Sequence, residues 1–152
     1  MGVRMTAFVR ARSSSSNLPP PIARHVQSST PSDGDAIASG VKAIMTGPSP
    51  IDVVDPGEPA STSEVIVHKL RADLSFSGLI ISDDVDLRGT LRGRMVPEVA
   101  VKALKAGVEL LLLAGGPQVE DVVARIIEAV ETGKLPEAAL KVAASKVTAE
   151  LA

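Results

Sequence analysis

Two short, unbroken aliphatic runs, Leu79–Ile81 and Leu110–Leu113, constrain the fold more than any other feature of the chain. Neither run alternates with polar residues, as a strand with one solvated face would. Runs of this kind are typical of central strands in a parallel sheet that is covered on both faces. Val41–Met45 (VKAIM) is a third strand candidate. Parallel strands need crossover connections, so we expect helices between the runs.

The intervening segments carry signals for helix starts, stops and buried faces. Ser61–Glu64 has capping-box spacing and predicts a helix that begins there. Pro97 suits the first turn of the next helix and Gly107 its end, and Pro117 and Gly133 bracket a third in the same way. A last helix should begin near Pro136. The residues predicted to form the buried faces are Ile66, Leu70 and Leu74 in the first helix, Val119, Val122, Val123, Ile126, Ile127 and Val130 in the third, and Leu140, Ala144, Val147 and Leu151 in the last.

The predicted order is therefore strand-helix repeated three times, followed by a terminal helix. This is an α/β fold with parallel strands and right-handed connections. Two architectures fit: a small three-layer α/β domain, or a partial (β/α)8 barrel, since a whole barrel typically needs about 250 residues. Three strands cannot close a barrel, so the second architecture implies a barrel segment.

The first part of the chain has a different composition. Residues 1–31 contain no acidic residue, four arginines and the runs Ser13–Ser16 and Pro19–Pro21. Such a segment buries little apolar surface, so we expect residues 1–40 to be a disordered or poorly ordered tail and residues 41–152 to form the folded domain. A transit peptide is the less favoured interpretation of the same composition.

Composition excludes several classes of protein. The chain of 152 residues has a net charge of −2 and no basic block, which argues against nucleic-acid binding. It has no cysteine, so disulfides, thiolate metal sites and a cysteine nucleophile are excluded. No apolar run approaches the length of about 20 residues that crosses a membrane. We expect a cytoplasmic protein that needs no cofactor and no metal.

The strongest candidate for chemistry follows the run Leu79–Ile81, where Asp83 and Asp84 lie at the predicted carboxyl end of a strand. Parallel α/β folds place their functional groups at that end. The plainer interpretation is a polar turn in which one aspartate accepts a backbone hydrogen bond. A third interpretation uses Asp84 and Asp86 as the carboxylates of a Mg²⁺-dependent phosphotransferase.

Two further features could bind an anion. Arg88, Arg92 and Arg94 lie in one glycine-containing loop and could form a flexible fork, although a solvated loop is the favoured interpretation. Gly115–Pro117 precedes a predicted helix, whose free N–H groups could bind an anion, although a plain turn is favoured.

Several ordered segments of residues 41–151 resemble one known family. These are Val41–Gly47, Asp55–Ser61, Leu70–Asp84 (LRADLSFSGLIISDD) and Ala100–Gly107, followed by the run Leu110–Leu113. Together they resemble the C-terminal part of the barrel domain of glycoside hydrolase family 3, in particular its bacterial β-N-acetylhexosaminidases. The resemblance implies that residues 41–152 correspond to about strands 6–8 of a (β/α)8 barrel.

By this resemblance, Asp83 corresponds to the nucleophile that attacks a β-linked amino-sugar glycoside, with net retention of configuration. Asp84 and Asp86 would instead organise the following loop. The family's proton donor is a histidine on a segment upstream of the matched region, and neither His25 nor His68 lies in a matching motif. We therefore expect impaired glycosidase activity, and the sugar-binding residues cannot be assigned. The alternative is a truncated, non-catalytic fragment or interaction module that self-associates through exposed sheet edges.

Overall fold

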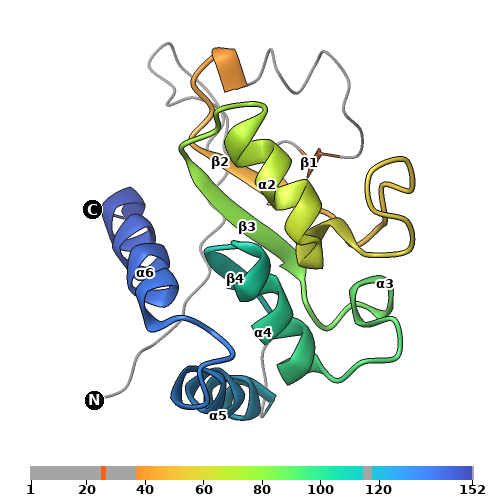
Figure 1. Ribbon diagram of the computed structural model, residues 1–152, viewed down its shortest axis with the longest axis vertical. Helices are drawn as coiled ribbons and strands as arrows, with labels where there is room; N and C mark the ends of the chain where they lie inside the picture. Colours follow the sequence, from red (N-terminus) through yellow and green to blue (C-terminus); the bar gives the residue numbers. More distant parts are fainter. Residues whose placement is uncertain (1–24, 27–36, 115–117, 152) are drawn as a thin grey trace.

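The computed structural model describes residues 25–26, 37–114 and 118–151; the side chains of residues 25, 26 and 151 lie outside this description. Figure 1 shows the helices gathered mainly on one side of a central sheet. The elements are β1 (His25–Val26), β2 (Ala43–Thr46), the 3₁₀ turn η1 (Ala60–Thr62), α2 (Glu64–Ala72), β3 (Leu79–Asp84), α3 (Arg88–Leu91), α4 (Val96–Ala106), β4 (Leu110–Leu112), α5 (Gln118–Glu131) and α6 (Glu137–Leu151).

The described strands form one parallel sheet in the order β1-β2-β3-β4. This confirms the prediction of parallel βα units, and each of the three predicted runs contains or overlaps a strand. The prediction of three strands was wrong, because His25 and Val26 also pair, with Met45 and Thr46 of β2. Two residues carry too little pattern to be recognised as a strand. The predicted tail of residues 1–40 lies mostly outside the described residues, so its boundary stays a prediction.

The two faces of the sheet belong to different apolar clusters. Ile44, Ile80 and Leu111 pack into the main core, which they share with buried side chains of α2, α4 and α5. Their neighbours Ala43, Leu79 and Ile81 form a second cluster on the other face, against which Val147 of α6 packs. Apolar residues on both faces explain why these strands are unbroken aliphatic runs.

The helices keep the predicted order, but three of their buried faces differ from the prediction. In α2, Ile66 and Leu70 are buried as predicted, whereas Leu74 lies beyond the helix end and is 37% exposed. In α6, the buried alanine is Ala143, and Ala144 faces solvent.

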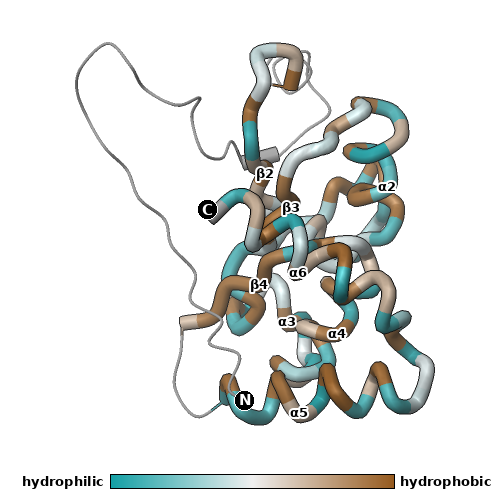
Figure 2. Tube along the Cα trace, turned by 90° about the vertical axis from the view of Figure 1, so that its left-hand side faces the viewer, coloured by the Kyte–Doolittle hydropathy of each residue, from teal (hydrophilic) through white to brown (hydrophobic). Residues whose placement is uncertain are grey.

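Helix α5 also differs, because Val123 and Ile127 are exposed while Val122, Ile126 and Ala129 are buried. Apolar and polar residues alternate along this helix in Figure 2. Its predicted stripe was therefore too wide, and a narrower face meets α4. No helix in the described ranges is long and apolar enough to cross a bilayer.

Glycines end one helix and permit one close approach. Gly107 ends α4 with a φ of 103°, as predicted, and this left-handed conformation favours a residue without Cβ. Gly78 precedes β3 and is packed so tightly that a Cβ would clash with the carbonyl oxygen of Lys42. The entrance to β3 is therefore fixed by backbone packing against the segment leading into β2.

Candidate active site

The candidate site lies at the carboxyl ends of β2 and β3, where four polar residues meet. Thr46 ends β2, and Ser82 and Asp83 lie near the end of β3. Ser61 comes from η1, far along the chain from β3. Thr46, Ser61 and Ser82 are fully buried, whereas Asp83 is partly exposed. The buried hydroxyls of Thr46 and Ser61 contact each other, and the Ser61 hydroxyl also contacts the backbone N–H of the partly exposed Asp83.

A β-bulge sets the local geometry of β3 at Ser82 and Asp83. Ile81 pairs with Leu110 and Asp84 pairs with Leu112, so three steps along β3 match two along β4. The hydroxyl of Ser82 accepts a hydrogen bond from Leu112 N at 3.0 Å. A bulge interrupts the ladder and re-aims side chains, which is why bulges are common beside active sites. Ser82 supplies an acceptor that the interrupted ladder would otherwise lack.

Ser61 joins the end of β2 to Asp83. Its hydroxyl lies 2.7 Å from the carbonyl oxygen of Thr46 and 2.9 Å from that of Gly47, both of which can accept its proton. The same oxygen accepts from the backbone N–H of Asp83 at 3.4 Å. The sequence prediction for Ser61 was wrong: the residue that caps α2 is Ser63, whose hydroxyl accepts from Ile66 N at 3.1 Å.

The three aspartates of the loop have different environments. Asp83 Oδ1 accepts from Asp84 N at 2.8 Å. Burial, together with the charges of Asp86 and Asp83, raises the pKa of Asp84 above its ordinary value. Asp86 Oδ2 accepts from Ala114 N at 3.3 Å and from Gln118 Nε2 at 3.0 Å.

These contacts bear on the predicted loop-organising role of Asp84 and Asp86. For Asp86 they agree with it, because its carboxylate fastens the loop to the chain between β4 and α5. For Asp84 it is the backbone carbonyl that accepts, from Thr90 Oγ1 at 3.2 Å. The phosphotransferase interpretation gains no support, because it needs the Asp86 carboxylate for a cation, and within the described ranges no three potential ligands converge on such a site.

The arginine loop is more ordered than predicted, because α3 forms within it. Arg94 donates to both carboxylate oxygens of Glu58, at 3.0 and 3.3 Å, and Lys102 lies 2.7 Å from Glu58 Oε2. Burial raises the pKa of Glu58, but hydrogen bonds from Lys102, Thr62 and Arg94 outweigh it and hold that pKa below its ordinary value. Arg94 thus pairs with the Glu58 carboxylate and does not form a free fork with Arg88 and Arg92, which are exposed. The Gly115–Pro117 turn lies outside the described residues.

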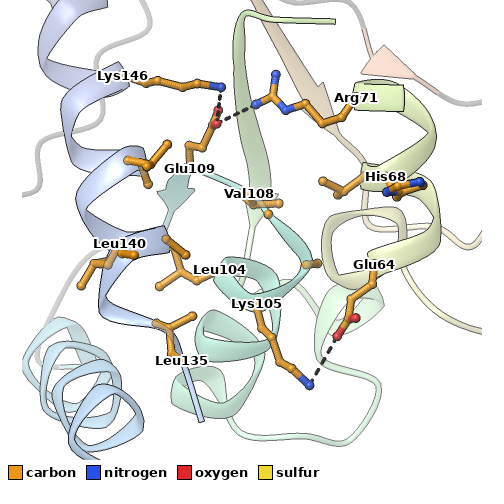
Figure 3. Close-up of a pocket in the computed structure, with 17 residues that line it drawn as sticks. Glu64, His68, Arg71, Leu104, Lys105, Val108, Glu109, Leu135, Leu140 and Lys146 are labelled. Carbon is orange, nitrogen blue, oxygen red and sulfur yellow. Dashed lines mark hydrogen bonds and ion pairs between the residues drawn. The ribbon is translucent and has the colours of Figure 1, made fainter. Parts of the chain in front are cut away.

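A cavity of about 620 Å³ lies elsewhere, between α2, α6 and the segment that joins α4 to β4 (Figure 3). Glu109 stands in its wall and contacts two cations, Arg71 Nη2 at 2.6 Å and Lys146 Nζ at 2.7 Å. Its other oxygen accepts from Ile80 N at 2.9 Å. Because the charges in this wall are mutually paired, we interpret them as fastening α2 and α6 to the amino end of the sheet.

His68 lines this same cavity, as Figure 3 shows, and it lies within α2 as predicted. The wall of the cavity includes Glu109, which immediately precedes β4 and so lies at the amino end of that strand. Asp83 lies near the carboxyl end of the neighbouring β3. For His25 the structure gives only the backbone, opposite Met45. No histidine among the described side chains therefore forms a hydrogen bond with Asp83.

The parallel strands with intervening helices define the chain as an α/β domain, and Asp83 lies near the carboxyl end of one of its strands. The model of the glycosyl hydrolase family 3 N-terminal domain matches residues 27–149, and the chain belongs to this family. The match begins upstream of residue 41, where the sequence analysis placed the domain boundary.

The relatives described next are named as hexosaminidases or as an N-acetylglucosaminidase. A β-hexosaminidase of Nitrosospira multiformis is 40% identical over 78 residues, which are 49% of this chain and 22% of that protein. The structure of a β-N-acetylhexosaminidase from Beutenbergia cavernae superposes with a TM-score of 0.71 and 27% identity, covering 78% of this chain and 36% of that one. A family 3 β-N-acetylglucosaminidase from Paenibacillus gives a TM-score of 0.72 and 28% identity, covering 77% and 23%. The chain thus spans between about a fifth and a third of the length of these relatives.

Proposed function

We propose that Asp83 is the nucleophile of a retaining glycosidase that acts on β-linked N-acetylhexosaminides. In this mechanism its carboxylate attacks the anomeric carbon, the aglycone leaves, and water later hydrolyses the covalent glycosyl-enzyme. The observation that carries the proposal is the position of Asp83, which is partly exposed near the carboxyl end of β3, at a bulge. The substrate class follows from the names of the family members that the chain resembles.

The rate at which this site cleaves a glycoside depends on the leaving group. Departure of an ordinary alkoxide needs a proton from a general acid. Among the described side chains, His68 lies in the wall of the cavity near Glu109, away from this site. A 2,4-dinitrophenolate leaves without protonation, so we propose that the chain cleaves such activated donors much faster than alkyl glycosides.

The test compares hydrolysis of 2,4-dinitrophenyl β-N-acetylglucosaminide by three proteins. Asp83→Asn keeps the shape of the side chain and the acceptor for Asp84 N, but it removes the nucleophile. Asp84→Asn is the matched control, because it changes the neighbouring carboxylate. The proposal predicts loss of turnover in the first variant and little change in the second. Equal activity of wild type and Asp83→Asn would refute it, and Mg²⁺-dependent phosphatase turnover lost in Asp84→Asn would favour the phosphotransferase.

A second candidate is a non-catalytic interaction module. In its favour, β1 and β4 are the outer strands of the described sheet, and open strand edges can pair with another chain. Self-association should then appear as concentration-dependent elution in size-exclusion chromatography. A compact monomer at all concentrations, with a cooperative melt, counts against this candidate.

A further inference from the structure

The buried hydroxyl of Ser61 has a set of contacts that a helix cap does not need. Ser61 is fully buried in η1, and its side chain faces the end of β2 instead of the first turn of α2. Ser63 already caps that helix. The contacts of Ser61 therefore call for another role, and all of them point toward the strand ends.

One hydroxyl serves four groups at this point. Its single proton can be donated to the carbonyl oxygen of Thr46 at 2.7 Å or to that of Gly47 at 2.9 Å. Its oxygen accepts from Thr46 Oγ1 and from Asp83 N, both at 3.4 Å. The single proton of Thr46 Oγ1 can instead go to the carbonyl oxygen of Ile81, at 3.2 Å, whereas the Asp83 N–H can still donate to a lone pair of Ser61. Ser61 consequently couples the exit of β2 to the peptide of Asp83.

The position of Asp83 depends on such contacts because of the bulge. On the β4 side the ladder slips by one residue beside Asp83, so regular strand pairing does not hold its peptide there. On that side, the hydroxyl oxygen of Ser82 accepts a hydrogen bond from Leu112 N. Ser61 supplies a contact on the β2 side. The Asp83 carboxylate itself accepts a hydrogen bond from the N–H of Asp84, at 2.8 Å.

We propose that Ser61 is a positioning residue, which holds the peptide of Asp83 so that its carboxylate is aimed at the substrate. This role rests on the proposed function of Asp83 as nucleophile. Displacement of a reacting group by about 1 Å can lower a rate about a hundredfold, so even a weak anchor affects the chemistry. Ser61 touches no substrate and acts through Asp83.

The test compares Ser61→Ala with Ser63→Ala, a nearly ideal pair. Both serines are buried, both lie just before α2, and both lose a hydroxyl with two partners or more. Only Ser61 contacts the Asp83 peptide. The readout is the rate constant for release of dinitrophenolate at saturating 2,4-dinitrophenyl β-N-acetylglucosaminide, per folded molecule. We expect a fall of about ten- to a hundredfold in Ser61→Ala and of less than about twofold in Ser63→Ala.

A second measurement does not depend on activity. Hydrogen exchange of the Asp83 amide, read by NMR relative to the Ile80 amide of the same protein, should accelerate about tenfold in Ser61→Ala and not in Ser63→Ala. If Ser61→Ala does not fold, Ser61→Cys, which keeps a similar shape with a weaker acceptor, should change both readouts in the same direction.

The outcomes separate the two proposals. Wild-type turnover with an unchanged rate in Ser61→Ala overturns the positioning role and leaves the nucleophile intact. An inactive wild type refutes the proposed function, and the exchange rate of the Asp83 amide then decides whether Ser61 anchors that peptide. An unchanged exchange rate in Ser61→Ala overturns the anchor in either case.

Discussion

Replacing Glu109 by glutamine should destabilise the fold, although Glu109 lies at the end of the sheet away from Asp83. Its side chain is 9% exposed and faces Arg71 and Lys146, which are 25% and 34% exposed (Figure 3). Glutamine keeps one acceptor for Ile80 N, but it removes the charge that both cations contact. It can also place an N–H donor where a carboxylate oxygen stood.

The magnitude follows from how exposed the partners are. Breaking a fully buried ion pair costs about 3–5 kcal/mol, whereas an exposed pair contributes about 0.2–1 kcal/mol. The two cations are partly exposed, so we expect Glu109→Gln to lower the free energy of unfolding by about 2 kcal/mol, between these limits. For a domain of this size, that corresponds to a fall in Tm of about 4–8 °C.

The assay is urea unfolding followed by far-UV circular dichroism, because the chain has no Trp or Tyr for fluorescence. The matched control is Glu137→Gln. Glu137 pairs with Lys141 across one turn of α6, with both side chains more than half exposed. This control should stay within about 0.5 kcal/mol of wild type. If Glu109→Gln is as stable as Glu137→Gln, the charges around the cavity do not fasten the helices to the sheet.

Two further changes test other parts of the fold. Gly78→Ala should leave little folded protein by circular dichroism, because the new Cβ would clash with the Lys42 carbonyl. In the control Gly89→Ala the new Cβ meets only ordinary contacts, so this variant should fold. Equal yields of the two folded variants would contradict the predicted clash. Glu58→Gln should cost about 1–2 kcal/mol at pH 7. Because the folded pKa of Glu58 is lowered, this contribution is present above its ordinary pKa of 4.5 and is lost as pH falls through the folded value, so the two urea curves should converge in acid. A difference that stays constant with pH would contradict that assignment.

The strands could be predicted from the sequence because burial on both faces leaves a direct pattern. The run Leu110–Leu113 matches β4 to within one residue, the run Leu79–Ile81 is the first half of β3, and the left-handed Gly107 ends α4 as expected. The two-residue β1 could not be recognised, since its pairing with β2 is long-range and its sequence has no period to detect. Helix faces were predicted less well, because the sequence shows a stripe of Val and Ile but not how wide the facing surface is.

The two serines before α2 show most clearly which features could not be predicted from local sequence patterns. On sequence grounds Ser61 is the better cap, because Glu64 follows it at capping-box spacing and Ser63 has Ile66 at that position. What separates them in the structure is the carbonyl groups of Thr46 and Gly47 at the end of β2, which lie close to Ser61 only after the sheet has formed. The same holds for Arg94, whose partner Glu58 lies 36 residues earlier in the chain. Such contacts join residues far apart in the chain, so they form only in the folded protein, and the contact between Ser61 and the Asp83 N–H is one of them.

As a nucleophile, Asp83 would form a covalent bond to the sugar, and this bond can be trapped. The protein is incubated with an activated fluoro-sugar analogue of β-N-acetylglucosamine, which forms the glycosyl-enzyme faster than water releases it, and is then digested and mapped by mass spectrometry. We expect one added sugar on the peptide that contains Asp83 and none in Asp83→Asn. A folded wild-type protein that hydrolyses the activated donor without an adduct, or with an adduct on another residue, would contradict it.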